Sequence, residues 1–156
     1  MTIPFGVNLS FCVKRWVTPG LWAKLVREEI GVDLVQFSYD LIDPTWPDDL
    51  LSELAGELRE ATAAHSLTVH SAFVGLAHYT YNQLLHPDDR VRDVAEEWLG
   101  RAYRFAALPG IARVGGPSGL SPHGSMAGRR TKSRRLITAT SSRACCGWPR
   151  SRIGTA

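Results

Sequence analysis

Polar side chains that could bind a small polar ligand recur in short β-rich segments of the first 116 residues. Asn8 lies in FGVNLSF, Gln36 in LVQFSY, and His70 and Phe73 in LTVHSAF. Amide side chains donate and accept hydrogen bonds, an imidazole can also reach a phosphate or a metal, and an aromatic ring can wall a pocket. If one sheet brings these segments together, the four side chains could form a binding site.

Each polar candidate also has a purely structural interpretation. Asn8 faces away from its apolar neighbours on period-two counting, so it could bind a ligand or bond only to the next strand, and His70 has the same two alternatives. Gln36 and Ser38 share one face of their segment. They could line a wet pocket or form a polar network that satisfies itself.

The segments that follow the strands add further candidates. Gly115-Gly116 would let a ligand approach the backbone, although a tight turn explains the pair as well. Asp40 follows the second β-rich segment, and Asp43 stands before Pro44, where turn chemistry is favoured over a role as a catalytic base. Four aromatic side chains could wall a site or simply pack a loop: Trp46, Phe73, Tyr79 and Tyr81.

These candidates lie in a regular alternation of expected strands and helices. The helix between the first two strands is expected to start at Thr18-Pro19 and to stop at Gly31. The apolar faces of the three helices are expected to include Leu21, Leu50 and Val94, respectively. The four strands are expected at residues 5–11, 34–39, 67–73 and 111–114.

This alternation predicts an α/β fold with parallel strands joined by right-handed crossovers. The helix-to-strand connections are short, whereas the strand-to-helix connections, such as residues 74–87, are long and aromatic. An active site at the C-terminal ends of parallel strands needs this asymmetry. Because no G-x-G-x-x-G motif and no P-loop occur, a (β/α)₈ barrel is favoured over a nucleotide-binding open sheet. A complete barrel typically needs ~250 residues, so 156 residues suggest half of one.

The strand ends resemble a known family. GVNLSF, VREEIGVDLVQFSYDLIDPTWP, LTVHSAFVGLAHYTYNQLLHPD and VGGPSG together resemble the sugar phosphate isomerase/epimerase family of the xylose isomerase-like TIM barrel superfamily. The four motifs occur in the right order and spacing over about residues 3–120. The resemblance implies the first half of a (β/α)₈ TIM barrel, with about four strands and three helices, in residues 1–120.

The resemblance also implies an activity. Such enzymes use a divalent metal (Mn, Mg or Zn) to hold a ketose or ketose phosphate while a carboxylate pair moves a proton beside the carbonyl. The metal ligands and catalytic carboxylates come mainly from later strands, so no catalytic or metal-binding residue is assigned here, and we expect an inactive chain that binds no metal. The expected substrate-binding residues are Asn8, Gln36, His70, Phe73, Gly115 and Gly116.

Charge changes abruptly near residue 117. Residues 1–116 carry ten Lys and Arg and all 15 Asp and Glu, whereas residues 117–156 carry eight Lys and Arg and no acid. Acids are common in ordinary proteins, so forty consecutive positions without one are rare by chance. The segment after residue 117 therefore does not continue the design of the first part.

We interpret the acid-free segment as coding sequence in a shifted frame. In the frame that begins two bases later, the first base of each codon becomes a middle base, and a middle T always encodes an apolar residue. Six residues of the segment have codons that begin with T, so each gives an apolar residue in the shifted frame. The spacing of these six positions is that of an amphipathic helix. We expect a frame shift between Gly119 and Met126 and a disordered basic tail at 121–156. The six are Cys145, Cys146 and Trp148 in any codon, and Ser141, Ser142 and Ser151 as TCN codons.

A half barrel has consequences for partners. Its outer strands and its interior would be exposed, which favours self-association. No membrane association is expected, because there is no run of 18 apolar residues and no signal peptide at the N-terminus, so a cytoplasmic location is expected. The three cysteines have no metal-ligand spacing and are expected to be reduced thiols.

Two other functions remain as alternatives. The first is a small binding protein with a basic nucleic-acid-binding arm, and salt-sensitive DNA or RNA binding that is lost on deleting residues 121–156 would favour it. The second is a metal-dependent abasic-site endonuclease of the same superfamily, which His70 would suit. The neutral or acidic loops after the second and third strands argue against it, because a DNA-facing rim should be basic.

The frame-shift hypothesis makes a prediction about the coding DNA. Read two bases later from about residue 119, it should give an uninterrupted amphipathic helix, with TCN codons at the three serines. Sequencing of the gene across the codons for residues 115–156 tests this. A stop codon in that frame, or AGY codons at these serines, would contradict it.

Overall fold

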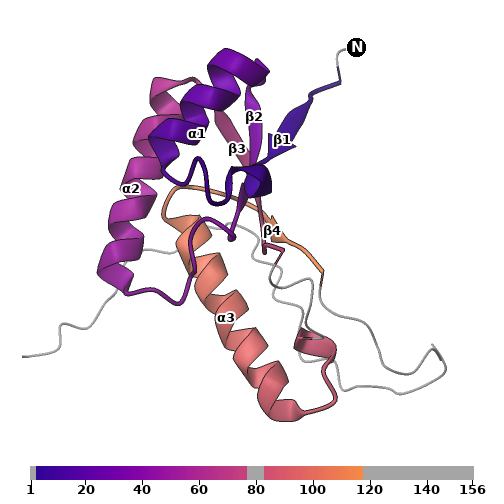
Figure 1. The fold of residues 1–156 in the computed structure, drawn as a ribbon. Helices are drawn as coiled ribbons and strands as arrows, with labels where there is room; N and C mark the ends of the chain where they lie inside the picture. The colour runs from indigo at the N-terminus through magenta and orange to yellow at the C-terminus, as the bar shows by residue number, and fades with distance from the viewer. Residues whose placement is uncertain (1–2, 77–82, 118–156) are drawn as a thin grey trace, which may run out of the picture. The chain divides into compact units, whose positions relative to one another are not determined.

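The sheet consists of short parallel strands in the order in which they occur along the chain. The computed structural model describes residues 3–76 and 83–117. Its four strands pair in the order β1-β2-β3-β4 (Figure 1). The predicted α/β class, with four parallel strands and three helices, is therefore confirmed. The strands are β1 (Gly6–Asn8), β2 (Leu34–Ser38), β3 (Thr68–Phe73) and β4 (Val114–Gly115).

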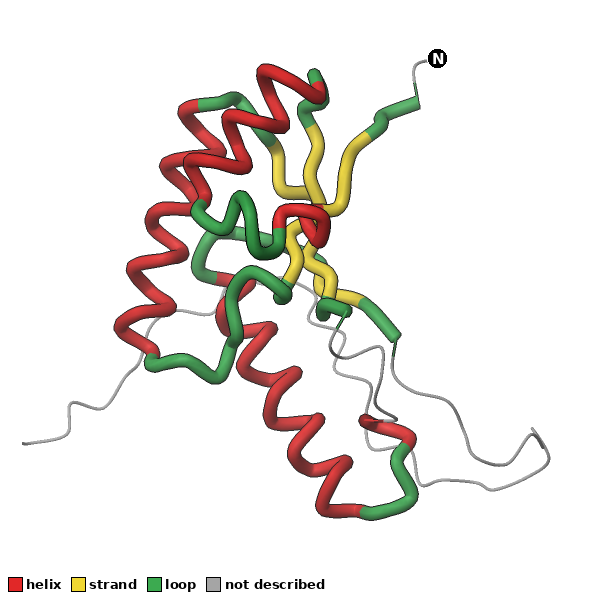
Figure 2. The backbone as a smooth tube through the Cα atoms, viewed as in Figure 1, coloured by secondary structure: helices red, strands yellow, loops and turns green. Residues whose placement is uncertain are grey.

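Three α-helices connect the strands and pack on one face of the sheet (Figure 2). Helix α1 begins at Pro19, as expected, and continues through a π-helical turn, η2 (Val26–Ile30), to Gly31. The φ of 74° at Gly31 is a left-handed conformation that favours glycine and ends the helix. The helices are α1 (Pro19–Leu25), α2 (Asp48–Ala64) and α3 (Asp89–Ala107).

Strand β2 forms the centre of the core. Phe37 and Tyr39 face the helices, where their ring centroids lie 5.8 and 5.9 Å from that of Phe105 in α3. The Tyr39 hydroxyl donates to the carbonyl of Ala102, and burial raises the pKa of Tyr39 well above its ordinary value. Because side chains alternate along a strand, Gln36 points to the opposite face. We call that side of the sheet the helix-free face.

Two strand boundaries differ from the sequence prediction. The first strand was expected to reach residue 11 but ends at Asn8, because Asn8 Oδ1 accepts a hydrogen bond from Ser10 N at 2.7 Å and starts a 3₁₀ helix, η1 (Leu9–Cys12). The fourth strand begins at Val114 rather than at Ile111. The side chain of Ile111 is instead buried in the core.

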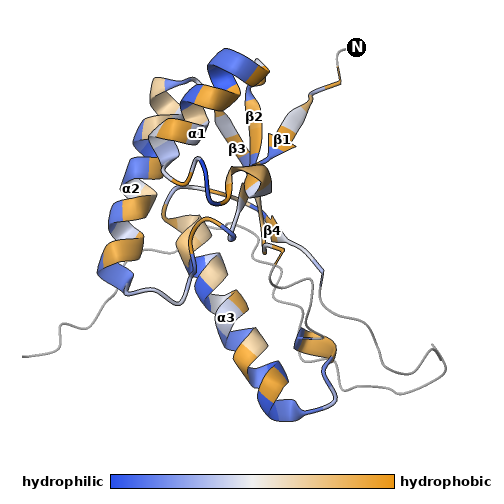
Figure 3. Ribbon diagram, in the orientation of Figure 1, coloured by the Kyte–Doolittle hydropathy of each residue, from blue (hydrophilic) through white to orange (hydrophobic). Residues whose placement is uncertain are grey.

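Three residues expected on buried helix faces are exposed. Leu21, Leu50 and Val94 are 52%, 39% and 68% exposed. The helices pack against a single sheet layer, so each buries a narrower stripe than its apolar pattern suggests. Figure 3 shows apolar colour on successive turns of the visible side of α3, and Figure 1 shows the first turns of that helix beyond the end of the sheet.

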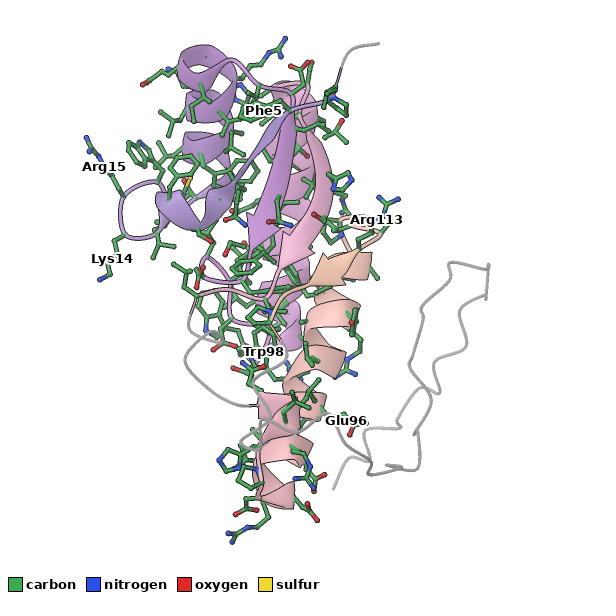
Figure 4. All side chains as sticks on the ribbon, turned by 90° about the vertical axis from the view of Figure 1, so that its right-hand side faces the viewer. Phe5, Lys14, Arg15, Glu96, Trp98 and Arg113 are labelled. Atoms are coloured by element: carbon green, nitrogen blue, oxygen red, sulfur yellow. The ribbon has the colours of Figure 1, made fainter. Side chains whose placement is uncertain are left out.

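The outer strands β1 and β4 each pair with one neighbour within residues 3–76 and 83–117. Ile3 and Phe5, beside β1, are 86% and 75% exposed (Phe5 is labelled in Figure 4). The self-association expected from exposed edges stays a prediction. No described helix is long and apolar enough to cross a membrane. The predictions for residues 121–156 lie outside the described residues.

Replacing Phe105 with alanine is expected to reduce the free energy of unfolding by about 3–5 kcal/mol, because a ring in contact with Phe37 and Tyr39 is lost. Val94→Ala is the control, since its exposed side chain should change stability by less than about 0.5 kcal/mol. Urea unfolding followed by circular dichroism measures both. Equal effects of the two substitutions would contradict this core.

Candidate functional site

A row of polar side chains crosses three strands on the helix-free face. Asn8 Nδ2 donates to Gln36 Oε1 at 2.6 Å, and Gln36 Nε2 donates to Ser71 Oγ at 3.0 Å. The register accounts for the row, because Asn8 pairs with Gln36 and Gln36 pairs with Ser71. The interpretation of Asn8 as bonded to the next strand is thus confirmed, while its role in substrate binding stays a prediction. We call these three residues the polar row.

His70 lies beside the polar row because strand β3 is irregular. Val35 pairs with Val69 and Gln36 with Ser71, so His70 is an extra residue in a β-bulge. A bulge redirects side chains, and bulges are frequent next to active sites. The imidazole is exposed, with Nδ1 3.3 Å from Ser71 Oγ. The sequence pattern missed Ser71, because a bulge shifts the period-two count by one residue.

A second polar cluster ties the ends of three strands together at Asp40. The hydroxyls of Ser10 and Ser38 lie 3.0 and 2.7 Å from Asp40 Oδ2 and donate to it, and the amide of Leu76 donates to Oδ1 at 2.7 Å. These donors follow or end β1, β2 and β3, respectively. Ser38 is fully buried. Asp40 therefore fixes the loops that border the polar row, and Ser38 belongs to a self-satisfied network.

Gly75 allows the chain to approach Asp40. Its φ is 97°, and a Cβ at this position would lie 2.8 Å from Asp40 Oδ1. Both the backbone conformation and the lack of space thus require glycine here. The sequence offered only one signal for this contact, a glycine two residues after an expected strand.

The remaining predicted residues divide between the two faces. Phe73 ends β3 and pairs with Ser38 and Gly115, which puts it on the helix-free face with the polar row. Gly115 is exposed, and an added Cβ there would meet no described atom within 4 Å. A Cβ at Gly116 would lie 2.1 Å from Val74 Cγ2, so packing explains this glycine.

Trp46 is not part of the same site. It lines an apolar groove of about 190 Å³ between α1 and α2, together with Trp22 and Leu54. Asp43 Oδ1 accepts hydrogen bonds from the amide and hydroxyl of Thr45, which confirms the turn interpretation. Tyr79 and Tyr81, the other predicted aromatic residues, lie outside the described residues.

Two further chemistries are unsupported within the described residues. The thiol of Cys12 is buried, and burial raises its pKa to about 11, so it is not a ready nucleophile. No three His, Cys, Asp or Glu side chains of residues 3–76 and 83–117 group to hold a metal ion. Without such a group, the residues described here do not fit the divalent metal that the resemblance implies.

A known crystal structure resembles the chain. It is that of a protein named "Putative Xylose isomerase" from Rhodospirillum rubrum, with 40% sequence identity and a TM-score of 0.71. The match covers 76% of this chain and 40% of that protein. The described fold is half of a xylose isomerase-like TIM barrel. No protein-family model matches the chain, and no curated protein matches it significantly.

Gly75→Ala is expected to lower the free energy of unfolding by about 1–3 kcal/mol, because it strains the backbone and displaces Asp40. Gly56→Ala is a matched control, because this α2 glycine has no atom within 4 Å of an added Cβ. The control should stabilise the protein by about 0.5–1 kcal/mol. Thermal unfolding compares the two, and a harmless Gly75→Ala would rule out the close contact with Asp40.

Proposed function

We propose that the helix-free face binds a small ketose or ketose phosphate, as the N-terminal half of a sugar isomerase/epimerase site. The observation that supports this most directly is the polar row Asn8–Gln36–Ser71, with His70 beside it. The likeness to the xylose isomerase-like barrel supports the same substrate class. The sugar phosphate isomerase/epimerase family is the specific family that we propose.

The polar row has donors available for sugar oxygens. The amide nitrogens of Asn8 and Gln36 each use one N–H within the row and keep a second that no described residue accepts. Both side chains are half-buried. A ligand hydroxyl or carbonyl oxygen could therefore accept a hydrogen bond from a donor whose position the row already fixes, which reduces the entropic cost of binding.

Within residues 3–76 and 83–117, the same face offers no pair of free carboxylates that would move a proton beside a carbonyl. The neighbouring carboxylate, Asp40, accepts hydrogen bonds from Ser10, Ser38 and Leu76. Residues 98–156 contain no Asp or Glu, so a carboxylate pair cannot come from the later part of the sequence. We therefore propose that this polypeptide holds the sugar and turns it over slowly or not at all, with residues 121–156 as a frame-shifted segment.

Binding of D-ribulose to the full 156-residue chain, measured by isothermal titration calorimetry, tests the proposal. Gln36→Ala should weaken binding about tenfold, which corresponds to losing one or two hydrogen bonds of about 0.5–1.5 kcal/mol each. Thr45→Ala is the control. Thr45 lies in the turn that precedes α2, so this substitution should leave the affinity unchanged. Ser71→Ala gives a second variant of the row if Gln36→Ala fails to fold.

Two results would contradict the proposal. One is the absence of ketose binding by the folded wild-type chain. The other is robust turnover of four- to six-carbon ketose phosphates with Mn²⁺, because it would show that the chain does contain the catalytic groups.

A further inference from the structure

The outer edge of β4 has backbone groups that face away from the sheet. The carbonyls of Arg113 and Gly115 accept hydrogen bonds from the β3 side at 2.7 and 3.0 Å. Successive residues of a strand direct their backbone groups to opposite sides, so the N–H and C=O of Val114 point away from β3. In the part of the chain that the structure describes, β4 pairs only with β3. Among these residues, the edge of β4 is therefore open to one more parallel strand.

The other outer strand, β1, has an open edge with apolar side chains beside it. Among the described residues, β1 pairs only with β2 (Figure 1). Val7 packs against the core, whereas Phe5 and Ile3, which precede it, are 75% and 86% exposed. Burial of these two side chains requires a further element at this edge.

The helix-free face combines the polar row with apolar side chains. Leu34 alternates with Gln36 along β2, so it lies on this face, as Phe73 does. Both apolar side chains are only half-buried, because the described helices pack on the other face. In a (β/α)₈ barrel, the corresponding side chains form inner layers to which opposite strands contribute. The composition of this face is therefore that of a barrel interior.

We propose that two copies of the chain close one eight-stranded barrel, in which β4 of each copy pairs in parallel with β1 of the other. The four described strands are half of the eight that such a barrel needs. A two-fold rotation about the barrel axis brings the β4 edge of each copy against the β1 edge of the other. This inference rests on the fold and its edges and not on the proposed sugar.

A second copy suits the open edges better than the rest of this sequence does. Residues 118–156 are too few to supply the four remaining strand–helix units, which take about half of the ~250 residues of a barrel. A second copy supplies all four. Antiparallel pairing of two β1 edges would also join two chains, but it would leave both β4 edges and both helix-free faces uncovered. Closure of the barrel covers all of them at once.

Closure also changes the surroundings of the polar row. The polar rows of the two copies would lie on opposite walls of one interior. The C-terminal end of β1 in one copy would lie beside that of β4 in the other, so strands of both copies would border each row. A ligand bound there would be shielded from water by the partner copy.

Sedimentation velocity of the full 156-residue chain, without ligand, tests the proposal. We expect a discrete species of twice the 17.2 kDa chain mass. Phe5→Glu places a charge at the β1 edge, and Val114→Pro removes the outward N–H of β4 without removing a bond to β3. Each substitution should weaken dimerisation at least about tenfold. Leu50→Glu, at an exposed position of α2 between the inner strands, is the matched control and should leave the dimer intact.

A mixture of the two edge variants distinguishes the β4–β1 junction from other pairings. A dimer of one Phe5→Glu chain and one Val114→Pro chain has one junction with both edges native and one with both edges altered. The mixture should therefore dimerise more tightly than either variant alone. Pairing between two β1 edges would instead leave Val114→Pro dimeric and give no rescue in the mixture, which would overturn the proposal.

Three further results would overturn it. They are a wild-type chain that stays monomeric at tens of micromolar, a mass that grows beyond the dimer with concentration, and a dimer that Phe5→Glu does not weaken. Phe5 is exposed, so this variant should fold, as circular dichroism can verify, and it keeps the test decisive even if Val114→Pro does not fold. Because no ligand is present, these failures would leave the proposed function intact.

Discussion

The structure depends on the alternation of side chains along strands that, among the described residues, are covered by helices on one face. Every second residue of β2, beginning with Val35, is buried under the three helices in contact with Trp22, Leu58 and Phe105 of that layer. The intervening residues must then point to the helix-free face. Burial of the aromatic residues thus determines where the polar residues go.

Hydrogen bonds between polar residues on that face connect the strands to one another. The polar row links β1, β2 and β3, while Asp40 links the segments that follow the same strands. No buried side-chain polar atom of the described residues lacks a hydrogen-bond partner. A network of this kind fixes one register of the sheet, because a slip by one residue would bury amides and hydroxyls without partners.

The sequence predicted the elements better than it predicted the site. The helical spacing of apolar residues located the helices, and Pro19 and Gly31 marked the start and end of the first one, because these signals act locally. The bulge at His70 and the bond from Leu76 to Asp40 depend on strands that are distant in sequence, so no local pattern indicates them.

The exposure of Val94 and Leu21 shows the limit of reasoning from apolar pattern. Both residues have the correct helical spacing for a buried face, yet the described layer of the sheet is too narrow to cover them. The pattern indicates which residues favour burial, whereas the extent of the partner surface decides which of them are buried.

The proposed function requires that the ligand binds the helix-free face and not the apolar groove between α1 and α2. Nuclear magnetic resonance spectra of the isotope-labelled chain, recorded during titration with D-ribulose 5-phosphate, test this most directly. The largest shifts should occur at the side-chain amides of Asn8 and Gln36 and at the backbone amides of residues 70–73 and 113–115. Shifts that gather instead at the indole groups of Trp22 and Trp46, or no shifts at all, would contradict it.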